Sequence, residues 1–276
     1  MSRATFQTKP NEDGLPLVDV LSDRLRCSKK QARVLLDARQ VFVNGKRVWM
    51  AKHTLKLKDV IETVRPEPKS HKIEILKRAG DLIVVNKPSG MVTNGSARSL
   101  EVRLQHELNN PQLCAVHRLD RDTSGCVLFA ANAAAKEKMI PLFKEERIVK
   151  IYRAIAVGRV SDQLKTITRD IDGESATTMV SVLDRNRDAS YLELRIHTGR
   201  THQIRKHLSG VRHPVLGDKE YAGEQRGNPV FRSVPRQMLH ACRLILPDPQ
   251  GGAAALRVTA PVPDDFQAVL DTLKLK

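Results

Sequence analysis

The spacing of apolar residues changes in character after residue 64. In residues 17–26 and again in residues 29–39, apolar side chains recur every three or four positions, which is the spacing of one face of an α-helix. Residues 41–49 then place short apolar runs on both sides of Asn44-Gly45, a pair that tolerates the positive φ angles of a tight hairpin. We therefore expect two short helices and a β-hairpin in this part of the chain.

Residues 73–276 favour a larger unit that mixes strands with helices. Alternating or continuous apolar runs predict strands there, and a helical spacing of apolar residues predicts helices. The expected strands are residues 73–76, 82–85, 126–130, 148–157, 177–183, 191–196, 237–246 and 253–259, and the expected helices are residues 100–108, 133–144 and 264–273. Residues 65–72 contain Pro66 and Pro68 and have the composition of a linker. The predicted organisation is an amino-terminal tail over residues 1–16, a small domain over 17–64, the linker, and a large domain over 73–276.

Composition narrows the class of protein and of partner. An apolar content of 41% is typical of a globular protein, and no apolar run approaches the ~20 residues that span a bilayer. Residues 1–9 lack the apolar core of a secretion signal, so the cytoplasm is the expected compartment. The formal charge of +16 points to a polyanionic partner. Nucleic acid is favoured over a membrane surface, because the basic residues are spread along the chain instead of forming one amphipathic helix.

Several kinds of chemistry lack their motifs in this sequence. The four cysteines include no Cys-x-x-Cys pair, which disfavours a zinc site of the usual spacing. His197, His202 and His207 recur every five residues, so a helix would not bring them to one face as metal ligands. The dinucleotide-binding, phosphate-loop and nucleophile-elbow motifs are also missing. These patterns predict neither a metal nor a cofactor.

Charged residues crowd into residues 116–125, directly before the expected strand 126–130. Asp120 lies between Arg118 and Arg121, and His117 precedes them. Cationic neighbours favour the ionised form of a carboxyl group, which is then available as a nucleophile, a general base or an electrostatic stabiliser. The same pattern fits a surface loop that holds a structural ion pair. The loop by itself leaves both interpretations open.

The order of helix, basic helix and Val-x-Val-Asn-Gly hairpin resembles the S-four-like (alpha-L) RNA-binding domain. The resemblance covers residues 17–64, and this chain has Lys58-Asp59 where family members often have Gly-Asp. Four basic residues are implied to lie along RNA phosphates: Lys29, Lys30, Arg33 and Lys46. The alternative interpretation is a small helix-hairpin module whose basic face is only solvated.

The larger unit resembles the RluA-type pseudouridine synthases, the class that isomerises uridine in ribosomal or transfer RNA. Residues 117–120 (HRLD) with residues 123–125 (TSG) match the catalytic motif of that family. Its other signatures follow in order at Lys150-x-Tyr152, residues 198–205 (TGRTHQIR) and residues 214–218 (PVLGD). The resemblance implies an α+β fold, in which a small helix-hairpin domain precedes a catalytic domain with a mixed, mainly antiparallel sheet flanked by helices.

The same resemblance implies roles for five residues. Asp120 is the essential group, which either attacks the sugar carbon or removes a sugar proton, and Arg205 pairs with it. Tyr152 would be read from its strand alone as a core residue, but the resemblance implies that it packs against the target uracil and helps to remove the proton from carbon 5. Arg118 is implied to fill the gap when the uridine leaves its stack. His117 is implied to shape the loop or to touch RNA.

The implied reaction breaks the bond from the sugar to ring nitrogen 1, rotates the uracil and rejoins it through carbon 5. This redox-neutral isomerisation requires no metal, nucleotide or redox carrier. RNA is the expected partner, with ribosomal RNA favoured and transfer RNA possible. The alternative function is a non-catalytic RNA-binding or ribosome-assembly factor on the same fold, which the charge and the hairpin fit equally well. The set Asp120, Tyr152 and Arg205 favours the enzyme, because a binding protein has no need to keep the three together.

Overall fold

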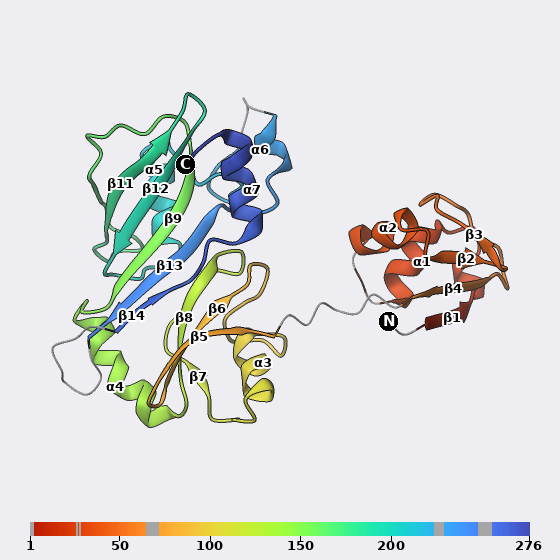
Figure 1. Cartoon of the computed structure of the whole chain (residues 1–276), viewed down its shortest axis with the longest axis horizontal. Helices are drawn as coiled ribbons and strands as arrows, with labels where there is room; N and C mark the ends of the chain where they lie inside the picture. Colours follow the sequence, from red (N-terminus) through yellow and green to blue (C-terminus); the bar gives the residue numbers. More distant parts are fainter. Residues whose placement is uncertain (1–2, 26, 28, 65–71, 224–228, 248–255) are drawn as a thin grey trace. The chain divides into compact units, whose positions relative to one another are not determined.

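The structure, a computed structural model, describes residues 3–25, 27, 29–64, 72–223, 229–247 and 256–276. The chain divides into two compact units, residues 1–71 and residues 72–276. Each unit carries its own sheet and its own hydrophobic core (Figure 1). Of the predicted linker 65–72, residues 65–71 lie outside the described part of the chain.

The small unit is a four-stranded antiparallel sheet with two α-helices. Its elements are β1 (Arg3–Gln7), the 3-10 helix η1 (Pro10–Glu12), α1 (Leu17–Arg24), α2 (Lys29–Asp37), β2 (Val41–Val43), β3 (Lys46–Arg47) and β4 (Val60–Val64), and the strand order is β1-β4-β2-β3. The predicted hairpin is present between β2 and β3, where Asn44 and Gly45 have φ angles of 51° and 74°. The predicted helices form as well, because the apolar face of each is buried in the core of this unit.

The first strand corrects the expectation of an amino-terminal tail. Residues Arg3–Gln7 pair antiparallel with β4, from Arg3 opposite Val64 to Gln7 opposite Val60. Five residues with one half-buried phenylalanine give too weak a periodic signal to predict a strand, and the pairing depends on backbone hydrogen bonds to residues more than fifty positions away. The small unit therefore begins at its first described residues and not at Leu17.

The turn before β4 forms without the glycine that family members often have there. Lys58 adopts a φ of 70°, a left-handed conformation that costs a side-chain-bearing residue roughly 1–2 kcal/mol. Asp59 stabilises the turn, because its carboxylate accepts hydrogen bonds from the Lys56 backbone N–H and from Asn44 Nδ2, both at 2.8 Å.

The large unit is built on one ten-stranded mixed sheet. Its strands are β5 (Glu74–Ala79), β6 (Leu82–Lys87), β7 (Cys114–Ala115), β8 (Ser124–Ala130), β9 (Val149–Val157), β10 (Thr166–Thr168), β11 (Thr177–Arg185), β12 (Ala189–Ile196), β13 (Leu239–Leu246) and β14 (Leu256–Thr259). The main path runs β10-β11-β12-β9-β13-β8-β6-β5, with β7 paired to β8 and β14 paired to β13. Only the β13–β8 pair is parallel among the described strands. This confirms the expected mixed, mainly antiparallel α+β fold.

Five helices flank this sheet: α3 (Leu100–Glu107), α4 (Ala133–Lys144), α5 (Gln203–Gly210), α6 (Val230–Ser233) and α7 (Asp264–Leu273). Alternate residues of β9 separate the two faces, because Tyr152 and Ala154 join the core that contains α3 and α5 whereas Ile155 joins the core that contains α7. Figure 1 shows α6 and α7 together beside β9 and β13. The sheet is therefore covered on both faces, and Tyr152 lies on the α5 side.

Helix α4 spans residues 133–144, as the apolar spacing predicts. A proline inside a helix favours a kink or an earlier end, but Pro141 leaves the bounds of α4 unchanged. Among the described residues, every helix is too short or too polar to cross a membrane.

Candidate active site

The loop between β7 and β8 is held in place from both of its sides. Thr93 exchanges hydrogen bonds with the backbone of Leu119, its hydroxyl accepting from the N–H and donating to the C=O at 3.1 Å each. The fully buried ammonium of Lys87 donates to the carbonyl of Arg121 at 2.9 Å and to the carbonyls of Pro88 and Met91. The backbone that carries Asp120 is therefore fixed by contacts that do not use the Asp120 side chain.

A second anchor comes from the segment before β13. The buried guanidinium of Arg236 donates to the carbonyl of Asp122 at 3.1 Å and forms a bidentate pair with Asp265 at the start of α7. Gln237 Nε2 donates to the Thr123 hydroxyl at 2.7 Å. At Gly125, an added Cβ would lie 2.2 Å from the Ala241 carbonyl oxygen, so only glycine allows β8 to approach β13 this closely.

Asp120 and Arg205, eighty-five positions apart in the sequence, are in contact. Arg205 Nη1 lies 3.1 Å from Asp120 Oδ2, and His202 Nε2 lies 3.7 Å from Asp120 Oδ1. The side chain of Arg205 is 7% exposed and that of Asp120 is 26% exposed. The cation is thus buried behind the carboxylate, and the carboxylate remains accessible.

Arg205 is shared among three carboxylates, of which sequence reasoning identified only Asp120. Asp218 binds Arg205 in bidentate geometry, with distances of 2.6 Å to Nε and 2.9 Å to Nη2. Glu220 accepts a further hydrogen bond from Nη2 at 3.0 Å, and the Tyr221 ring centre lies 4.8 Å from the guanidinium carbon. The five donors of a guanidinium permit such sharing. Asp218 ends the signature at residues 214–218, so the family motif contained the signal that could have found it.

Burial disfavours the charged forms of both Arg205 and Asp218. The contact between the two side chains favours the charged forms of both. Burial alone would raise the pKa of Asp218, but hydrogen bonds from Arg205 and from the backbone N–H groups of Glu220 and Tyr221 lower that pKa below its usual value. Burial alone would lower the pKa of Arg205, but Asp218 and Asp120 raise it. Arg205 is consequently a permanent cation whose position is fixed chiefly by Asp218.

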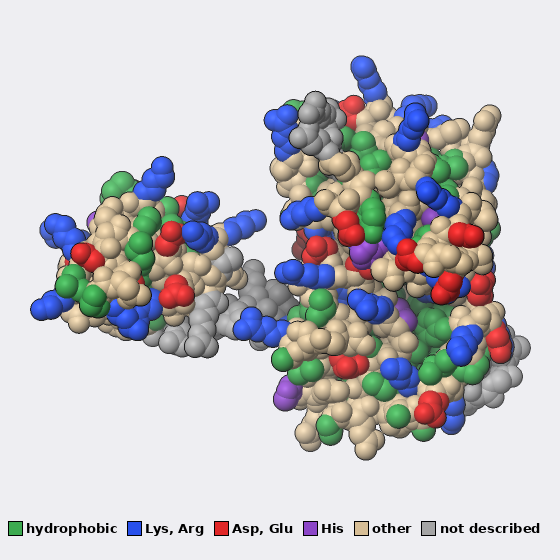
Figure 2. All heavy atoms as spheres, turned by 180° about the vertical axis from the view of Figure 1, so that it is seen from behind, with side chains coloured by type: hydrophobic (Ala, Val, Ile, Leu, Met, Phe, Trp, Pro, Cys, Tyr) green, Lys and Arg blue, Asp and Glu red, His purple; other side chains and the backbone are tan. Residues whose placement is uncertain are grey.

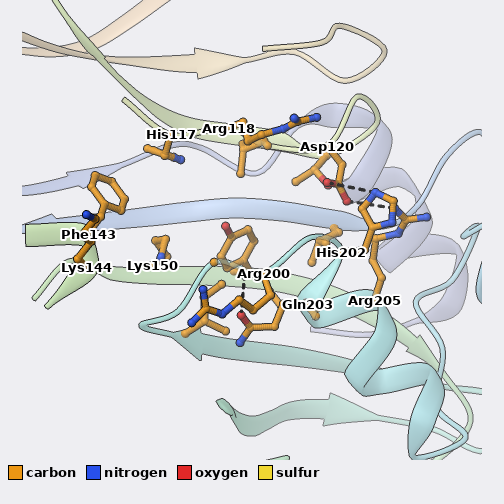
Figure 3. A pocket seen from close by; sticks show the side chains of 17 residues that line it. His117, Arg118, Asp120, Phe143, Lys144, Lys150, Arg200, His202, Gln203 and Arg205 are labelled. Carbon is orange, nitrogen blue, oxygen red and sulfur yellow. Dashed lines mark hydrogen bonds and ion pairs between the residues drawn. The ribbon is translucent and has the colours of Figure 1, made fainter. Parts of the chain in front are cut away.

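A pocket of about 380 Å³ opens beside Asp120. Figure 3 shows Asp120, His202 and Arg205 at one end and Phe143, Lys144 and Lys150 at the other. The remaining lining residues are His117, Arg118, Leu119, Thr123, Tyr152, Ile196, Gly199, Arg200, Gln203, Ile204 and Leu239. Among these lining residues Asp120 is the one carboxylate, and it lies at the end of the pocket opposite Lys144 and Lys150.

Tyr152 contributes its side chain to this pocket from β9, where it pairs with Leu194 of β12. The residue is 7% exposed, and burial, followed by the nearby charge of Asp120, raises the pKa of its phenol. The hydroxyl forms no hydrogen bond with the other described residues. Tyr152 therefore presents a neutral phenol to the pocket at physiological pH.

Lys150 lines the pocket and belongs to the Lys150-x-Tyr152 signature, but the sequence predicted no role for it. It is 6% exposed, and its ammonium makes no hydrogen bond or ion pair with another described residue. Its nitrogen lies 5.4 Å from the Phe143 ring centre. Burial, assisted by the charge of Arg200 and partly offset by Glu146, lowers the pKa of Lys150 to about 8. A buried amine without an anionic partner is costly, which makes it a candidate for contact with an anionic or carbonyl-bearing ligand.

His117 and Arg118 lie next to each other but face different surroundings. The Nε2 atom of His117 accepts the Leu128 backbone N–H at 3.1 Å, and its ring packs against Phe143. Burial, with the nearby charge of Lys150, lowers the pKa of His117 to about 3, so the ring is neutral. Arg118 is exposed and lines the pocket.

The four basic residues expected to touch RNA phosphates all belong to the small unit and are exposed. Lys29 forms an ion pair with Asp19 at 2.9 Å. Lys30 and Arg33 lie on α2 with no ion pair to another described residue, and Lys46 lies in β3. Figure 2 shows lysine and arginine side chains projecting from several sides of this unit. The exposure of these four side chains is compatible with phosphate contacts.

Comparison with known proteins places both units in described families. Residues 81–210 match the model of the RNA pseudouridylate synthase family, and residues 15–61 match the S4 domain. The "ribosomal large subunit pseudouridine synthase D" of Haemophilus ducreyi is 31% identical over 245 residues, which cover 78% of this chain and 75% of that protein. The protein of the same name from Haemophilus influenzae is 30% identical and covers 89% of this chain and 83% of its own length.

Solved structures agree with these matches. The human RNA pseudouridylate synthase domain containing 4 superposes with a TM-score of 0.62 at 26% identity, covering 74% of this chain and 94% of that chain. The human RNA pseudouridylate synthase domain containing 1 gives a TM-score of 0.57, also at 26% identity, and covers 76% and 98% of the two chains. The chain therefore belongs to the RNA pseudouridylate synthase family and is an enzyme that isomerises uridine in RNA to pseudouridine.

Proposed function

We propose that this enzyme modifies uridines of large-subunit ribosomal RNA and that Asp120 is its essential catalytic residue. The observation that carries the proposal is the contact between Arg205 and Asp120 at 3.1 Å beside the phenol of Tyr152. The RNA target is supported by the names of the relatives, which are large-subunit synthases. Transfer RNA is the alternative substrate, and the cytoplasm is the proposed place of action because the proposed substrate is ribosomal RNA.

The geometry presents the carboxylate of Asp120 to the pocket before the substrate arrives. Arg205 holds one carboxylate oxygen while the side chain stays 26% exposed toward the pocket. An anion at this position can attack carbon 1′ of the ribose, releasing uracil through the electrons of the glycosidic bond, or it can remove a proton from carbon 2′. In the first route, carbon 5 of the released uracil attacks carbon 1′ and displaces the Asp120 carboxylate; in the second, carbon 5 adds to carbon 1′ while carbon 2′ regains its proton. In both routes carbon 5 then loses its proton and ring nitrogen 1 gains one, so no oxidant or reductant is required.

Tyr152 acts on the uracil and not on the sugar in this proposal. The phenol of Tyr152 is neutral because burial raises its pKa. Its ring packs against the uracil while the uracil rotates. The carbon 5 proton must be removed after the new bond forms, and a phenol can accept this proton only after it has lost its own. The proposed primary role is therefore packing, with proton transfer at carbon 5 as a second role.

Arg118 and His117 have separate proposed roles at the mouth of the pocket. Arg118 is exposed and takes the place of the extruded uridine. His117 stays neutral and shapes the loop through its hydrogen bond from Leu128. Lys29, Lys30, Arg33 and Lys46 bind RNA phosphates through the S4 domain.

The test uses RNA labelled with tritium at carbon 5 of uridine, because the label must leave when carbon 5 bonds to the sugar. The wild-type enzyme should release label from large-subunit ribosomal RNA, and the Asp120→Asn variant should release none while its Tm is retained. Release from transfer RNA alone would overturn the proposed target. Intact RNA binding without release from either RNA would instead support the non-catalytic assembly factor.

A further inference from the structure

The single tryptophan of this chain lies exposed on the small unit. Trp49 is 54% exposed and its neighbour Met50 is 60% exposed. The core of the same unit consists of smaller aliphatic residues of α1, α2, β2 and β4, and Trp49 is not among them. A large aromatic side chain left at the surface forgoes the stability of burial, and such exposed apolar surface marks a binding site when it is part of a shaped patch.

Trp49 contributes to a hollow of about 470 Å³ at the β2–β3 hairpin, named here the hairpin hollow. The lining residues are Val43, Asn44, Lys46, Arg47, Val48, Trp49, Met50, His53, Thr54, Lys56 and Asp59. The hollow therefore combines one indole, several aliphatic side chains and a set of polar side chains from one continuous stretch of the chain, residues 43–59.

The charged residues that line the hairpin hollow are mostly cationic. Lys46, Arg47 and Lys56 line it together with a single carboxylate, Asp59. That carboxylate is already occupied, because it accepts the Lys56 backbone N–H and the Asn44 side-chain amide. Neither Lys46 nor Arg47 makes an ion pair with another described residue. The net cationic charge is thus available to an anionic ligand.

The indole of Trp49 is also held by a cation. The Arg39 guanidinium carbon lies 5.4 Å from the Trp49 ring centre, a cation–π contact that orders the ring. Arg47 itself lies over the Phe42 ring, with 5.2 Å from its guanidinium carbon to the ring centre, and its N–H groups have no ion-pair partner among the described residues. An ordered aromatic face beside such cations suits single-stranded nucleic acid, because bases stack on the ring while the adjacent phosphates contact the positive charge.

We propose that the hairpin hollow binds an unpaired nucleobase of the RNA substrate, stacked on Trp49, with the flanking phosphates contacting Lys46 and Arg47. The proposal adds detail to the RNA-binding role of the S4 domain. It depends on the proposed function only for the identity of the natural ligand, ribosomal RNA. It adds a base-binding subsite to a domain for which the sequence predicted phosphate contacts alone. A protein partner is the alternative occupant, and it predicts no preference for a base-bearing oligomer over an abasic one.

The sole tryptophan allows a direct measurement on the full-length protein, because a base stacked on the indole quenches its fluorescence. The probes are a short single-stranded oligoribonucleotide and an abasic oligomer with the same sugars and phosphates. We expect quenching by the base-bearing oligomer and at most a small change with the abasic one. Equal quenching by both, or binding detected by anisotropy without any quenching, would overturn the proposal.

Three variants separate stacking on Trp49 from the apolar volume of its side chain. Trp49→Leu keeps apolar volume but removes the stacking face, and its affinity for the base-bearing oligomer should fall about 5- to 100-fold. Trp49→Phe should recover most of that loss. Val34→Leu, at an exposed apolar position outside the hollow, is the matched control and should bind like wild type. Affinity for the abasic oligomer should be the same in all four proteins.

Failure of this proposal is distinguishable from failure of the proposed function. The fluorescence and affinity measurements involve no uridine isomerisation, so they stand even if the ribosomal RNA assay shows no label release. Conversely, a Trp49→Leu enzyme that binds the base-bearing oligomer as tightly as wild type would overturn the hollow as a base site while leaving the assignment of Asp120 untouched.

Discussion

Arg205 and Lys150 lie at opposite ends of one pocket and show two ways of burying a cation. The side chain of Arg205 is 7% exposed and contacts Asp120, Asp218 and Glu220. Lys150 is 6% exposed and has no anionic partner among the described residues. The pKa of Arg205 is raised by its partners, whereas burial lowers the pKa of Lys150 to about 8.

The difference indicates what each cation is for. The desolvation free energy of a fully paired buried charge is offset by its partners within the folded protein, so such a charge can position another group. A buried charge without a partner is destabilising until a ligand compensates it. We therefore expect Arg205 to position Asp120, and we expect the partner of Lys150 to be part of the substrate.

The largest effect is expected from Arg205→Met. The substitution leaves Asp218 buried without its partner, which should cost about 3–5 kcal/mol of unfolding free energy, and it leaves Asp120 unoriented, so label release should fall below detection. Urea unfolding and the tritium assay measure the two effects. Arg200→Met is the matched control, because its ion pair with Glu174 is exposed and should be worth less than about 1 kcal/mol. An Arg205→Met protein as stable as wild type would contradict the conclusion that Arg205 compensates the buried charge of Asp218.

Lys150→Met should give the opposite combination of effects. Removing an unpaired buried charge should leave the unfolding free energy unchanged or raise it, while kcat/KM should fall by about 10- to 100-fold for the loss of one charge-assisted hydrogen bond to the substrate. Lys144→Met, which removes an exposed cation from the same end of the pocket, is the control and should have the smaller effect on kcat/KM. A Lys150→Met enzyme with lower stability and unchanged kcat/KM would show that Lys150 is structural.

The pH dependence of stability offers a sharper test of Lys150. Because the folded-state pKa is lowered to about 8 from the usual 10.5, the unfolded chain binds more protons between these values. The unfolding free energy contributed by this group should therefore rise as pH increases from about 8 to about 10.5. Lys87 has a pKa lowered to about 7 by burial and adds a similar trend. The measurement is the difference between wild type and Lys150→Met across this range, which isolates Lys150.

The smallest effects are expected at the exposed cations of the S4 domain. Lys30→Ala and Arg33→Ala should each reduce the steepness of the log affinity against log salt plot by about 0.7 on a single-stranded RNA. Lys29→Ala should change it less, because Lys29 is partly neutralised by Asp19. Titrations at several salt concentrations measure the slopes. Identical slopes for all three variants and wild type would exclude these residues as phosphate contacts.

Features with a short-range cause were predictable from the sequence. The hairpin at Asn44-Gly45 forms because two adjacent residues tolerate positive φ, and α7 spans the predicted residues because its apolar spacing and the preceding proline both act within a few positions. Strand β1 was missed, because its formation depends on pairing with β4 at the far end of the same unit. The pairing of Asp120 with Arg205 came from a family resemblance and not from any local signal.

By itself, the sequence determined where helices, turns and most strands begin, and the order of its motifs identified the kind of reaction. The tertiary structure decided which charges meet. Asp218 and Glu220 share Arg205, and Lys150 lines the pocket with no anionic partner among the described residues. Both arrangements depend on how β9, α5 and the segment after α5 pack. Coulomb energies depend on the distance between charges, and desolvation depends on burial. The spacing of residues along the chain gives neither the distance nor the burial.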